Sequence, residues 1–251
     1  MINLGNAEGY ETYDNVHQIG NVSRAENSEP YPYFWGYKTA GIFQTAEEVA
    51  NYVNAKGEMM QPNAQPGDVI FVDYNGDGVI DSSDKTKIGK GDPDWTYGMS
   101  LTASYKGFDM SMLWAGSIGN DIFDATRRLD LRYVNLPKEM MDRWHGEGTS
   151  NSMPRFTWTN ANDNYRASDL YVKDGSYLRL KNIQLGYTLP SALTKKVFIK
   201  SLRFYVAAEN LLTITSYKGM EPEISYGTQS GIDRGYYPQV RTFTIGTNIK
   251  F

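Results

Sequence analysis

One short segment of the sequence has the residue types and spacing of a calcium-binding loop. Between residues 73 and 84, oxygen-bearing side chains stand at positions 1, 3, 5, 9 and 12, and a glycine, Gly78, stands at position 6. Calcium requires this density of hard oxygen donors, and the glycine permits the sharp turn around the ion. The last position is an aspartate, which is shorter than the usual glutamate and can bind through one oxygen. The predicted ligands are Asp73, Asn75, Asp77, the backbone carbonyl of Val79, Asp81 and Asp84.

The residues on either side of this loop are not typical of the helices of an EF-hand. Residues 67–72 (GDVIFV) lead into the loop, and residues 89–93 (GKGDP) lead out of it. Two interpretations stay open: a calcium loop without flanking helices, or a solvated turn cluster of Asp, Asn and Gly. In the first interpretation the ion is structural, with an affinity of about 0.1–1 mM as in extracellular modules.

Other residues that could perform chemistry give weaker signals. A glycosidase needs two carboxylates across a cleft, but carboxylates are so common that a pair in the sequence indicates little. Three pairs are available: Asp92/Asp94, Asp163/Asp169 and Glu221/Glu223. The sequence has no cysteine, which excludes a disulfide scaffold, a Cys-ligated zinc site and a thiol nucleophile. His17 and His145 are the only histidines, and no nucleophile elbow or phosphate-binding glycine loop is present, so we expect no enzyme.

Composition narrows the class of protein. The chain has 251 residues, which allows one large domain or two small ones, and its net charge of −4 disfavours a nucleic-acid partner. No apolar run approaches the roughly 20 residues of a transmembrane helix. Aromatic residues reach 14%, which suits a β-rich protein in water and equally a membrane β-barrel. The first 20 residues are not a signal peptide, so either the protein stays inside the cell or its true N-terminus is missing.

Strict alternation of apolar and polar residues predicts the main strands. From Tyr97 to Tyr105 the apolar side chains occupy the odd positions, and the strand from Phe108 follows after Lys106-Gly107, which predicts a hairpin. The alternation slips near Lys181 and Asn182, which indicates a β-bulge. Further strands are predicted at about 177–189, 202–214 and 243–251, and a less regular one at 31–43.

The connections between these strands alternate between short and long. The short ones are 106–107 and 190–201, whereas 44–94, 121–176 and 216–241 are much longer. Outer-membrane barrels have this asymmetry, with short periplasmic turns and long extracellular loops, and their strands turn one face to lipid and the other to the lumen. Two short helices are predicted in the loops, one behind a capping box at Thr45–Glu48 and one over 137–144.

The last eight residues, 244–251, also favour a membrane barrel. A polar residue, a glycine, an apolar residue and a terminal aromatic, Phe251, follow the pattern of an outer-membrane assembly signal. The alternative is a β-protein that ends on an edge strand, although a terminal Phe on an exposed apolar face would promote aggregation in water. Aromatic residues near the predicted strand ends suit the girdles found at membrane interfaces.

Several motifs, in the same order along the chain, resemble the SusC/RagA-type TonB-linked outer-membrane transporters of Bacteroidetes. The matching stretches are 36–44 (GYKTAGIFQ), 67–84, 91–98 (GDPDWTYG), 105–109 (YKGFD), 116–120 (GSIGN), 174–187 and 208–213 (AENLLT). The resemblance extends over about residues 30–251 and ends on the terminal Phe.

The resemblance implies the fold and the domain organisation. The expected fold is all-β: an antiparallel transmembrane β-barrel segment made of the last five or six strands, with long extracellular loops that carry short helices. Residues 1–30 would be an incomplete N-terminal segment, and residues 31–251 the C-terminal part of the barrel. The extracellular loops would lie at about 44–94, 121–176 and 216–241. So few strands cannot span a membrane alone, because open sheet edges leave backbone groups unsatisfied in lipid.

The resemblance also implies the function and the partners. The full transporter would import oligosaccharides or peptides together with a SusD-like surface lipoprotein that covers the barrel. The TonB complex would supply energy through the missing N-terminal region, and outer-membrane lipid would surround the protein. A structural Ca²⁺ in the 73–84 loop would make a long extracellular loop rigid. The alternatives are a secreted, calcium-stabilised β-sandwich that binds glycans, and a glycan-acting enzyme that uses loop carboxylates.

Overall fold

The computed structural model describes residues 10–13, 21–126, 135–136, 138–224 and 230–251. The chain divides into two compact units. The first comprises Met1–Asp92, Asp121–Lys173 and Ser225–Arg234, and the second comprises Pro93–Asn120, Asp174–Ile224 and Gly235–Phe251. Within the described ranges, every helix is too short or too polar to cross a membrane.

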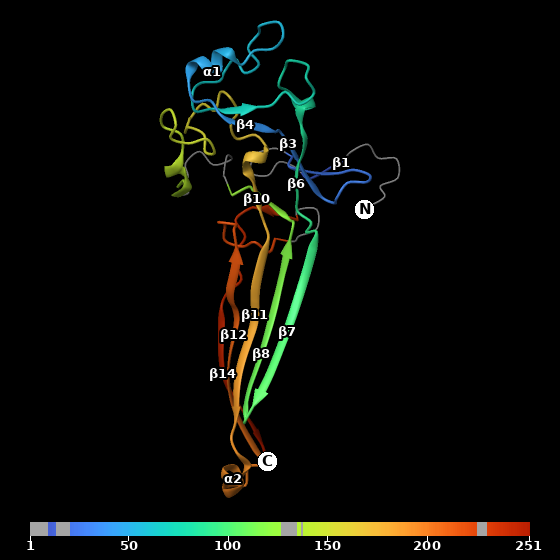
Figure 1. Ribbon diagram of the computed structural model, residues 1–251, viewed down its shortest axis with the longest axis vertical. Coiled ribbons are helices and arrows are strands. Elements are labelled where there is room, and N and C mark those ends of the chain that lie inside the picture. Colours follow the sequence, from blue (N-terminus) through green and yellow to red (C-terminus); the bar gives the residue numbers. More distant parts are fainter. Residues whose placement is uncertain (1–9, 14–20, 127–134, 137, 225–229) are drawn as a thin grey trace. The chain divides into compact units, whose positions relative to one another are not determined.

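An antiparallel sheet of five strands forms the second unit (Figure 1). Its strands are β7 (Trp95–Tyr105), β8 (Phe108–Ile118), β11 (Tyr177–Thr188), β12 (Ser201–Thr215) and β14 (Thr242–Lys250). Their order in the sheet, β14-β12-β11-β8-β7, follows the order of the chain, so the sheet is a meander. The predicted antiparallel, all-β fold is confirmed, and these five strands are the ones that the alternation of the sequence predicts.

The predicted two-residue hairpin joins β7 to β8. Tyr105 and Phe108 are the last cross-strand pair before the turn. Lys106 and Gly107 both have positive φ, 47° and 89°. Positive φ at both central residues defines the type I′ turn, whose twist matches that of the two strands it connects.

One face of the sheet is apolar across its whole width. The cross-strand registers align the apolar positions of neighbouring strands row by row. Three successive rows, starting at the β7–β8 turn, are Tyr105-Phe108-Tyr187-Phe204, Ala103-Met110-Leu185-Val206-Ile245 and Leu101-Met112-Ile183-Ala208-Phe243. We call this the apolar face. Ala208 on this face is buried, but Phe243 and Ile245 are 69% and 85% exposed.

The predicted β-bulge lies in β11, at the expected place. The register of β11 with both neighbouring strands shifts between Leu180 and Asn182. Before the bulge, Leu178 and Leu180 belong to the apolar face, and after it Ile183 takes over. The extra residue, Lys181, therefore allows the apolar sequence pattern to change phase while the side chains stay on one face.

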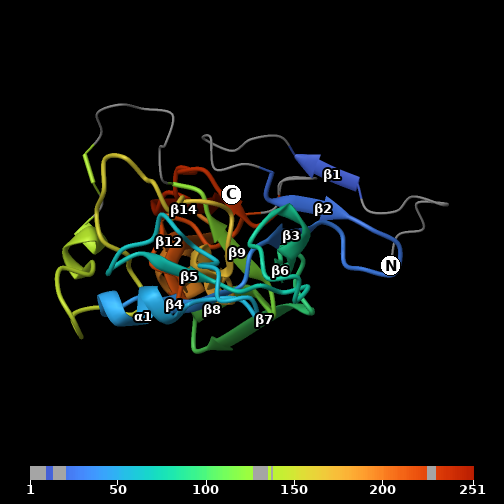
Figure 2. The ribbon, with the colours of Figure 1, turned by 90° about the horizontal axis from the view of Figure 1, so that it is seen from above.

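The first unit contains short strands in three small sheets. One sheet has the order β1-β2-β3-β6 and is seen side by side in Figure 2. Its strands are β1 (Tyr10–Tyr13), β2 (Ser23–Ala25), β3 (Tyr33–Gly36) and β6 (Thr86–Lys90). A pair joins β4 (Thr39–Ile42) to β5 (Val69–Phe71). The third sheet combines β10 (Val172–Asp174), β9 (Asp121–Asp124) and β13 (Ile232–Asp233).

Small apolar clusters hold the first unit together. The largest packs Val22, Phe34, Ile88, Phe123, Ala125, Ala167, Tyr171 and Ile232. A second cluster comprises Tyr37, Val69 and Phe71, and a third comprises Phe43, Val49 and Ala64. The side chains of these clusters come from segments far apart in the sequence, so they fix the loops of the chain to one another.

Short helical turns occur in the connections of both units. They are α1 (Ala46–Asn51), η2 (Ser82–Asp84), η3 (Lys138–Asp142), η4 (Asp169–Tyr171), α2 (Ser191–Thr194) and η5 (Lys195–Val197). Thr45 caps α1 as predicted, because its side chain accepts the N–H of Glu48. The carboxylate of Glu48, however, accepts the N–H of Gln44 and not that of Thr45, so the predicted capping box is only half formed.

Two of the predicted elements are wrong in detail. The aromatic segment 31–43 is not one strand: β3 pairs with β2 and β6, while β4 pairs with β5. Gly36 is the last residue of β3, and a Cβ there would lie 2.5 Å from the carbonyl oxygen of Ala167, so this position excludes a side chain. The helix expected at 137–144 is the 3₁₀ turn η3, and Pro137 lies outside the described residues.

Candidate functional site

The predicted calcium loop is a chain of tight turns held by its own side chains. Asp73 accepts the backbone N–H groups of Gly76 and Gly78, both at 2.7 Å. Asn75 accepts the N–H of Asp77 at 2.8 Å, and Asp77 accepts that of Val79 at 2.9 Å. Each of these side chains thus bends the backbone so that its oxygens stay inside the loop.

Asp84 joins the two ends of this loop. Its carboxylate is fully buried and accepts the N–H groups of Tyr74 and Asp81, both at 2.8 Å. In return, the side chain of Asp81 accepts the N–H of Ser83 at 2.7 Å, which starts the turn η2. A buried carboxylate without donors would be costly, so these hydrogen bonds determine where the loop closes.

The loop side chains offer oxygen atoms alone, which suits a hard cation such as calcium. Among the described residues, however, no three histidine, aspartate or glutamate side chains are gathered as a metal site. Hydrogen bonds instead join the side chains of Asn75 and Asp77, and join the Asp84 carboxylate to the backbone N–H of Asp81. In this structure the side-chain oxygens of the loop accept hydrogen bonds from backbone N–H groups, and these bonds hold the loop in shape.

A buried polar network fixes two distant loops of the first unit. Asp68 is fully buried and forms a two-point ion pair with Arg155, with Nε–Oδ1 at 2.6 Å and Nη2–Oδ2 at 3.2 Å. Asn164, also fully buried, donates to Asp68 at 2.8 Å and accepts the N–H of Val69 at 3.0 Å. Gln61 and Asn162 extend the network through a hydrogen bond of 2.8 Å. No pattern in the sequence predicts these contacts, because they join residues 95 to 101 positions apart.

A second buried network lies at the end of the sheet opposite the β7–β8 turn. Arg179 of β11 is 3% exposed and donates to Thr213 of β12 at 2.9 Å. Its guanidinium also pairs with Glu221 and, at 2.9 Å, with Glu223. Lys181 binds the same oxygen of Glu223 at 2.5 Å. The network attaches the segment after β12 to the polar face of the sheet.

Glu221 is the most enclosed acid of this network. It accepts the backbone N–H groups of Glu223 at 2.9 Å and Gln239 at 3.0 Å. Burial by itself raises the pKa of the Glu221 carboxyl, but the hydrogen bonds from Gln239, Arg179 and Glu223 outweigh burial and hold this pKa below its usual range. Glu221 is therefore charged at neutral pH and holds Gln239 and Glu223 in place.

Two of the three acidic pairs considered for an enzyme are occupied by structural contacts. Glu221 and Glu223 belong to the Arg179 network, as described. Asp163 pairs with Arg166 at 3.5 Å, and Asp169 accepts from the hydroxyl of Thr39 at 2.6 Å. Asp92 and Asp94 fall in different compact units. His145 is exposed, with Nδ1 3.0 Å from the carbonyl of Arg143, and His17 lies outside the described residues.

Comparison with known proteins places the chain in a family. No family model matches it. The chain is 36% identical to TonB-dependent receptor P3 of Formosa agariphila over 227 residues, which is 87% of the chain and 22% of that protein. It is 27% identical to TonB-dependent receptor SusC of Bacteroides thetaiotaomicron over 242 residues, 92% of the chain and 21% of SusC. The chain belongs to the SusC/RagA-type TonB-dependent receptors.

Solved structures of this receptor family share the fold of the chain. The RagAB peptide importer in the open-open state matches 99% of the chain with a TM-score of 0.67 and 20% sequence identity, over 25% of the importer chain. The predicted resemblance to SusC/RagA transporters and the predicted barrel-type fold are confirmed. The chain spans about a fifth to a quarter of the length of the receptors it matches. The relatives carry the names of receptors and transporters and not of enzymes, and a secreted β-sandwich is not favoured.

Removal of the buried arginine should loosen this part of the receptor. Arg179→Gln leaves Glu221 buried without its charged partner, and breaking a buried pair in this way costs about 3–5 kcal/mol. We expect the Glu223 and Gln239 amides of the full-length receptor to lose hydrogen-exchange protection to a similar extent. Lys181→Gln is the matched control, because this partly exposed ion pair should cost less than about 1 kcal/mol. Equal hydrogen-exchange protection of these amides in both variants would show that the ion pair between Arg179 and Glu221 does not stabilise this segment.

Acid should release the same amides. A carboxyl whose pKa is lowered on folding stabilises the fold above its unfolded pKa, and this contribution disappears as the pH falls through the folded pKa. The usual pKa of Glu221 is 4.5 and its folded pKa is lower, so protection of the Gln239 and Glu223 amides should be full at neutral pH and should be lost only at a pH below 4.5. Hydrogen exchange, corrected for the intrinsic pH dependence of amide exchange, measures this. A Glu221→Gln receptor should lack the acid transition, and a transition that persists in it would assign the effect to another group.

Proposed function

We propose that the chain forms part of the barrel wall of an outer-membrane importer. The observation that carries this proposal is the apolar face, which runs across five hydrogen-bonded strands and is covered by no other described segment of the sheet unit. The strands are 9 to 15 residues long, enough to cross a bilayer when tilted. Lipid would then cover the apolar face, and the polar face would line the lumen.

The connections of the sheet support an orientation in the membrane. At one end the strands are joined by the two-residue turn 106–107 and by the segment from Leu189 to Lys200. At the other end the chain leaves the sheet for the long segments that build the first unit. Outer-membrane barrels place their short turns in the periplasm and their long loops outside the cell, so the first unit would be extracellular.

Five strands are not a closed barrel. Within the described residues, β7 and β14 each pair with one neighbour, so each presents a row of backbone groups at an open edge. In lipid every such group costs several kcal/mol, and closed single-chain barrels have at least eight strands. We propose that other strands of a receptor about four times longer close the barrel, and that this chain is its C-terminal part. The relatives support this proposal, because they are several times longer than the part matched here.

The proposed activity is uptake of oligosaccharides or peptides, energised by TonB. The names of the relatives support it: they are TonB-dependent receptors, one of them is SusC, and the RagAB structures are of a peptide importer. A SusD-like surface lipoprotein would be the partner on the extracellular side. The chain itself would contribute wall, loops and loop anchors such as the Arg179 network.

We propose that the loop at 73–84 binds a structural calcium ion. Asp73, Asn75, Asp77, the Val79 carbonyl, Asp81 and Asp84 would supply oxygen ligands, and the ion would replace part of their present bonding to backbone amides. The loop contacts its surroundings through Asn54, whose amide donates to the carbonyl of Gly78 at 3.2 Å. An ion here would therefore stiffen a wider part of the first unit.

A pair of lysine substitutions tests which face of the sheet meets lipid. Leu101 and Thr102 are neighbours in the middle of β7 and point to opposite faces. Leu101→Lys should cost about 2–4 kcal/mol in the bilayer and reduce the amount of full-length receptor in the outer membrane, whereas Thr102→Lys should be tolerated on the lumen side. Immunoblots of the membrane and soluble fractions measure the amount of each variant in the outer membrane. Equal tolerance of the two lysines, or a wild-type receptor in the soluble fraction, would contradict the barrel proposal.

Protease protection tests the calcium proposal. In the full-length receptor, calcium should protect the segment 44–94 from trypsin, and a chelator should remove that protection. The double variant Asp73→Ala, Asp77→Ala should be cleaved at the same rate with and without calcium, because it lacks two ligands. The control Glu47→Ala removes an exposed acid of the same segment outside the loop and should keep the calcium effect. Calcium-dependent protection that survives in the double variant would show that the ion binds elsewhere.

A further inference from the structure

The end of the sheet that carries the short connections is a distinct surface. The last cross-strand pairs are Tyr105 with Phe108 and Ser201 with Lys250, and Thr188 donates its N–H to the Gly107 carbonyl at 2.7 Å. These contacts bring residues 104–109, 186–204 and 247–251 together, at the end of the sheet where Figure 1 labels α2 and the C-terminus. We call this surface the turn end.

The turn end is strongly basic. Five lysines are exposed there: Lys106, Lys195, Lys196, Lys200 and Lys250. The only side-chain carboxylate in these residue ranges is Asp109, and Arg203 already holds it through two bonds of 2.9 and 2.5 Å. The five lysines therefore have no side-chain carboxylate partner among the residues described at this end. The opposite end of the sheet differs, because it carries Asp94, Asp174, Glu221 and Glu223.

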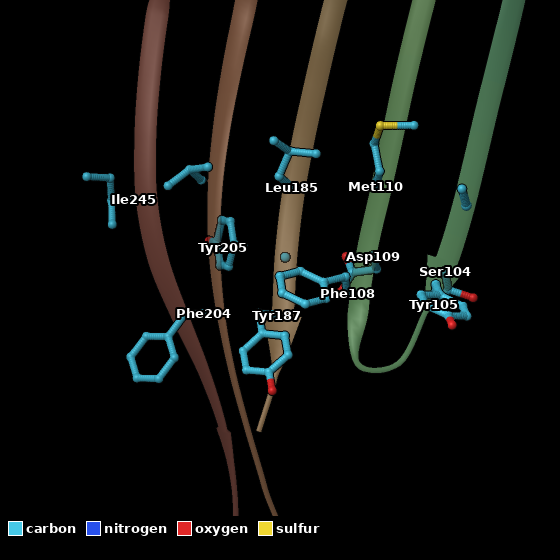
Figure 3. Close-up of a pocket in the computed structure, with 13 residues that line it drawn as sticks. Ser104, Tyr105, Phe108, Asp109, Met110, Leu185, Tyr187, Phe204, Tyr205 and Ile245 are labelled. Atoms are coloured by element: carbon cyan, nitrogen blue, oxygen red, sulfur yellow. The ribbon is translucent and has the colours of Figure 1, made fainter. Parts of the chain in front are cut away.

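Exposed aromatic rings lie beside these lysines. Tyr105 is 70% exposed and Phe108 is 62% exposed, and they form the outermost row of the apolar face with Tyr187 and Phe204 (Figure 3). Phe198 is 93% exposed and has a positive φ of 59°. A phenylalanine rarely adopts this conformation, and here the hydrogen bonds that end the turn 191–197 hold it away from the sheet.

A hollow on the sheet adjoins this surface. It measures about 570 Å³ and is lined mainly by apolar and aromatic side chains of the two rows nearest the turn (Figure 3). Tyr105, Phe108, Met110, Leu185, Tyr187 and Phe204 belong to its lining. Along the strand direction, the surface therefore changes within a few residues from the apolar hollow to the aromatic row and then to the lysines.

This order matches the cross-section of a lipid monolayer. Hydrocarbon meets apolar side chains, aromatic rings favour the interface, and lysines reach from the interface to phosphate groups with their flexible stems. Basic residues near an anionic membrane surface each contribute about a threefold to tenfold gain in binding. We propose that the turn end binds the headgroups of anionic phospholipids, with an acyl chain in the hollow. This inference rests on the proposed function, since it needs the sheet to span a bilayer.

Lipid retention by the full-length receptor tests the proposal. The receptor is placed in nanodiscs of zwitterionic lipid with a graded fraction of phosphatidylglycerol, and native mass spectrometry counts the phosphatidylglycerol that stays bound. The triple variant Lys195→Gln, Lys196→Gln, Lys200→Gln should bind this lipid roughly a hundredfold more weakly. Wild-type binding should also weaken at high salt, because these lysines are exposed. The control Lys56→Gln, Lys138→Gln, Lys218→Gln removes three exposed lysines outside the turn end and should bind like wild type.

The outcomes separate this inference from the proposed function. A wild-type receptor that does not fractionate with the outer membrane would refute the barrel itself. A membrane-embedded triple variant that retains phosphatidylglycerol like wild type would refute the lipid site alone, as would a wild-type receptor that retains only lipopolysaccharide. If the triple variant fails to fold, the single variants Lys195→Gln and Lys196→Gln decide, and each should weaken binding about fivefold. Phe198→Ser should weaken it without changing its salt dependence, because the variant removes an apolar contact and no charge.

Discussion

The five-stranded sheet depends on keeping one face apolar while every interior strand stays hydrogen-bonded to both neighbours. Side chains alternate between the two faces along a strand, so a register slip of one residue would move every side chain of the strand to the opposite face. β11 meets this constraint with one extra residue, Lys181. Without it, Leu178 and Leu180 would lie on the opposite face from Ile183 and Leu185. The bulge is therefore what allows a sequence with two phases of alternation to build a single apolar surface.

The bulge and the buried charges belong to the same piece of structure. Lys181, the extra residue, binds Glu223, and Arg179, two residues earlier, binds both Glu221 and Glu223. Both cations reach the same carboxylate, Glu223, from β11. Burial of Arg179 requires acids close by, since an unpaired buried charge would be too costly. Arg179 also fixes the position of Glu221, and the Glu221 carboxylate in turn accepts the backbone N–H of Gln239.

The sheet was predictable from the sequence because its information is local. Alternation gave the five strands, the Lys106-Gly107 turn and the bulge, each within a few residues. The first unit has short strands whose partners lie far away: Tyr37, for example, pairs with Ser168, and Asp68 meets Arg155. The segment 31–43 is rich in aromatics, as a strand would be, but its two halves join different sheets. For the 73–84 loop, spacing reveals the donor types, whereas the burial of Asp84 depends on packing that no spacing encodes.

Different interactions stabilise the two units, and the difference follows from what would surround each unit in the proposed barrel. The sheet can expose Ile245 and Phe243 because lipid would cover them, so it needs no apolar partner from the protein. The first unit would meet water, and its apolar clusters are small. It gains rigidity from buried amides and charges, such as Asn164, whose hydrogen bonds reach Asp68 and Val69. Such a network tolerates no missing partner, because each lost bond leaves a buried polar group unsatisfied. In the proposed barrel, such a network would hold the extracellular loops in one conformation in water.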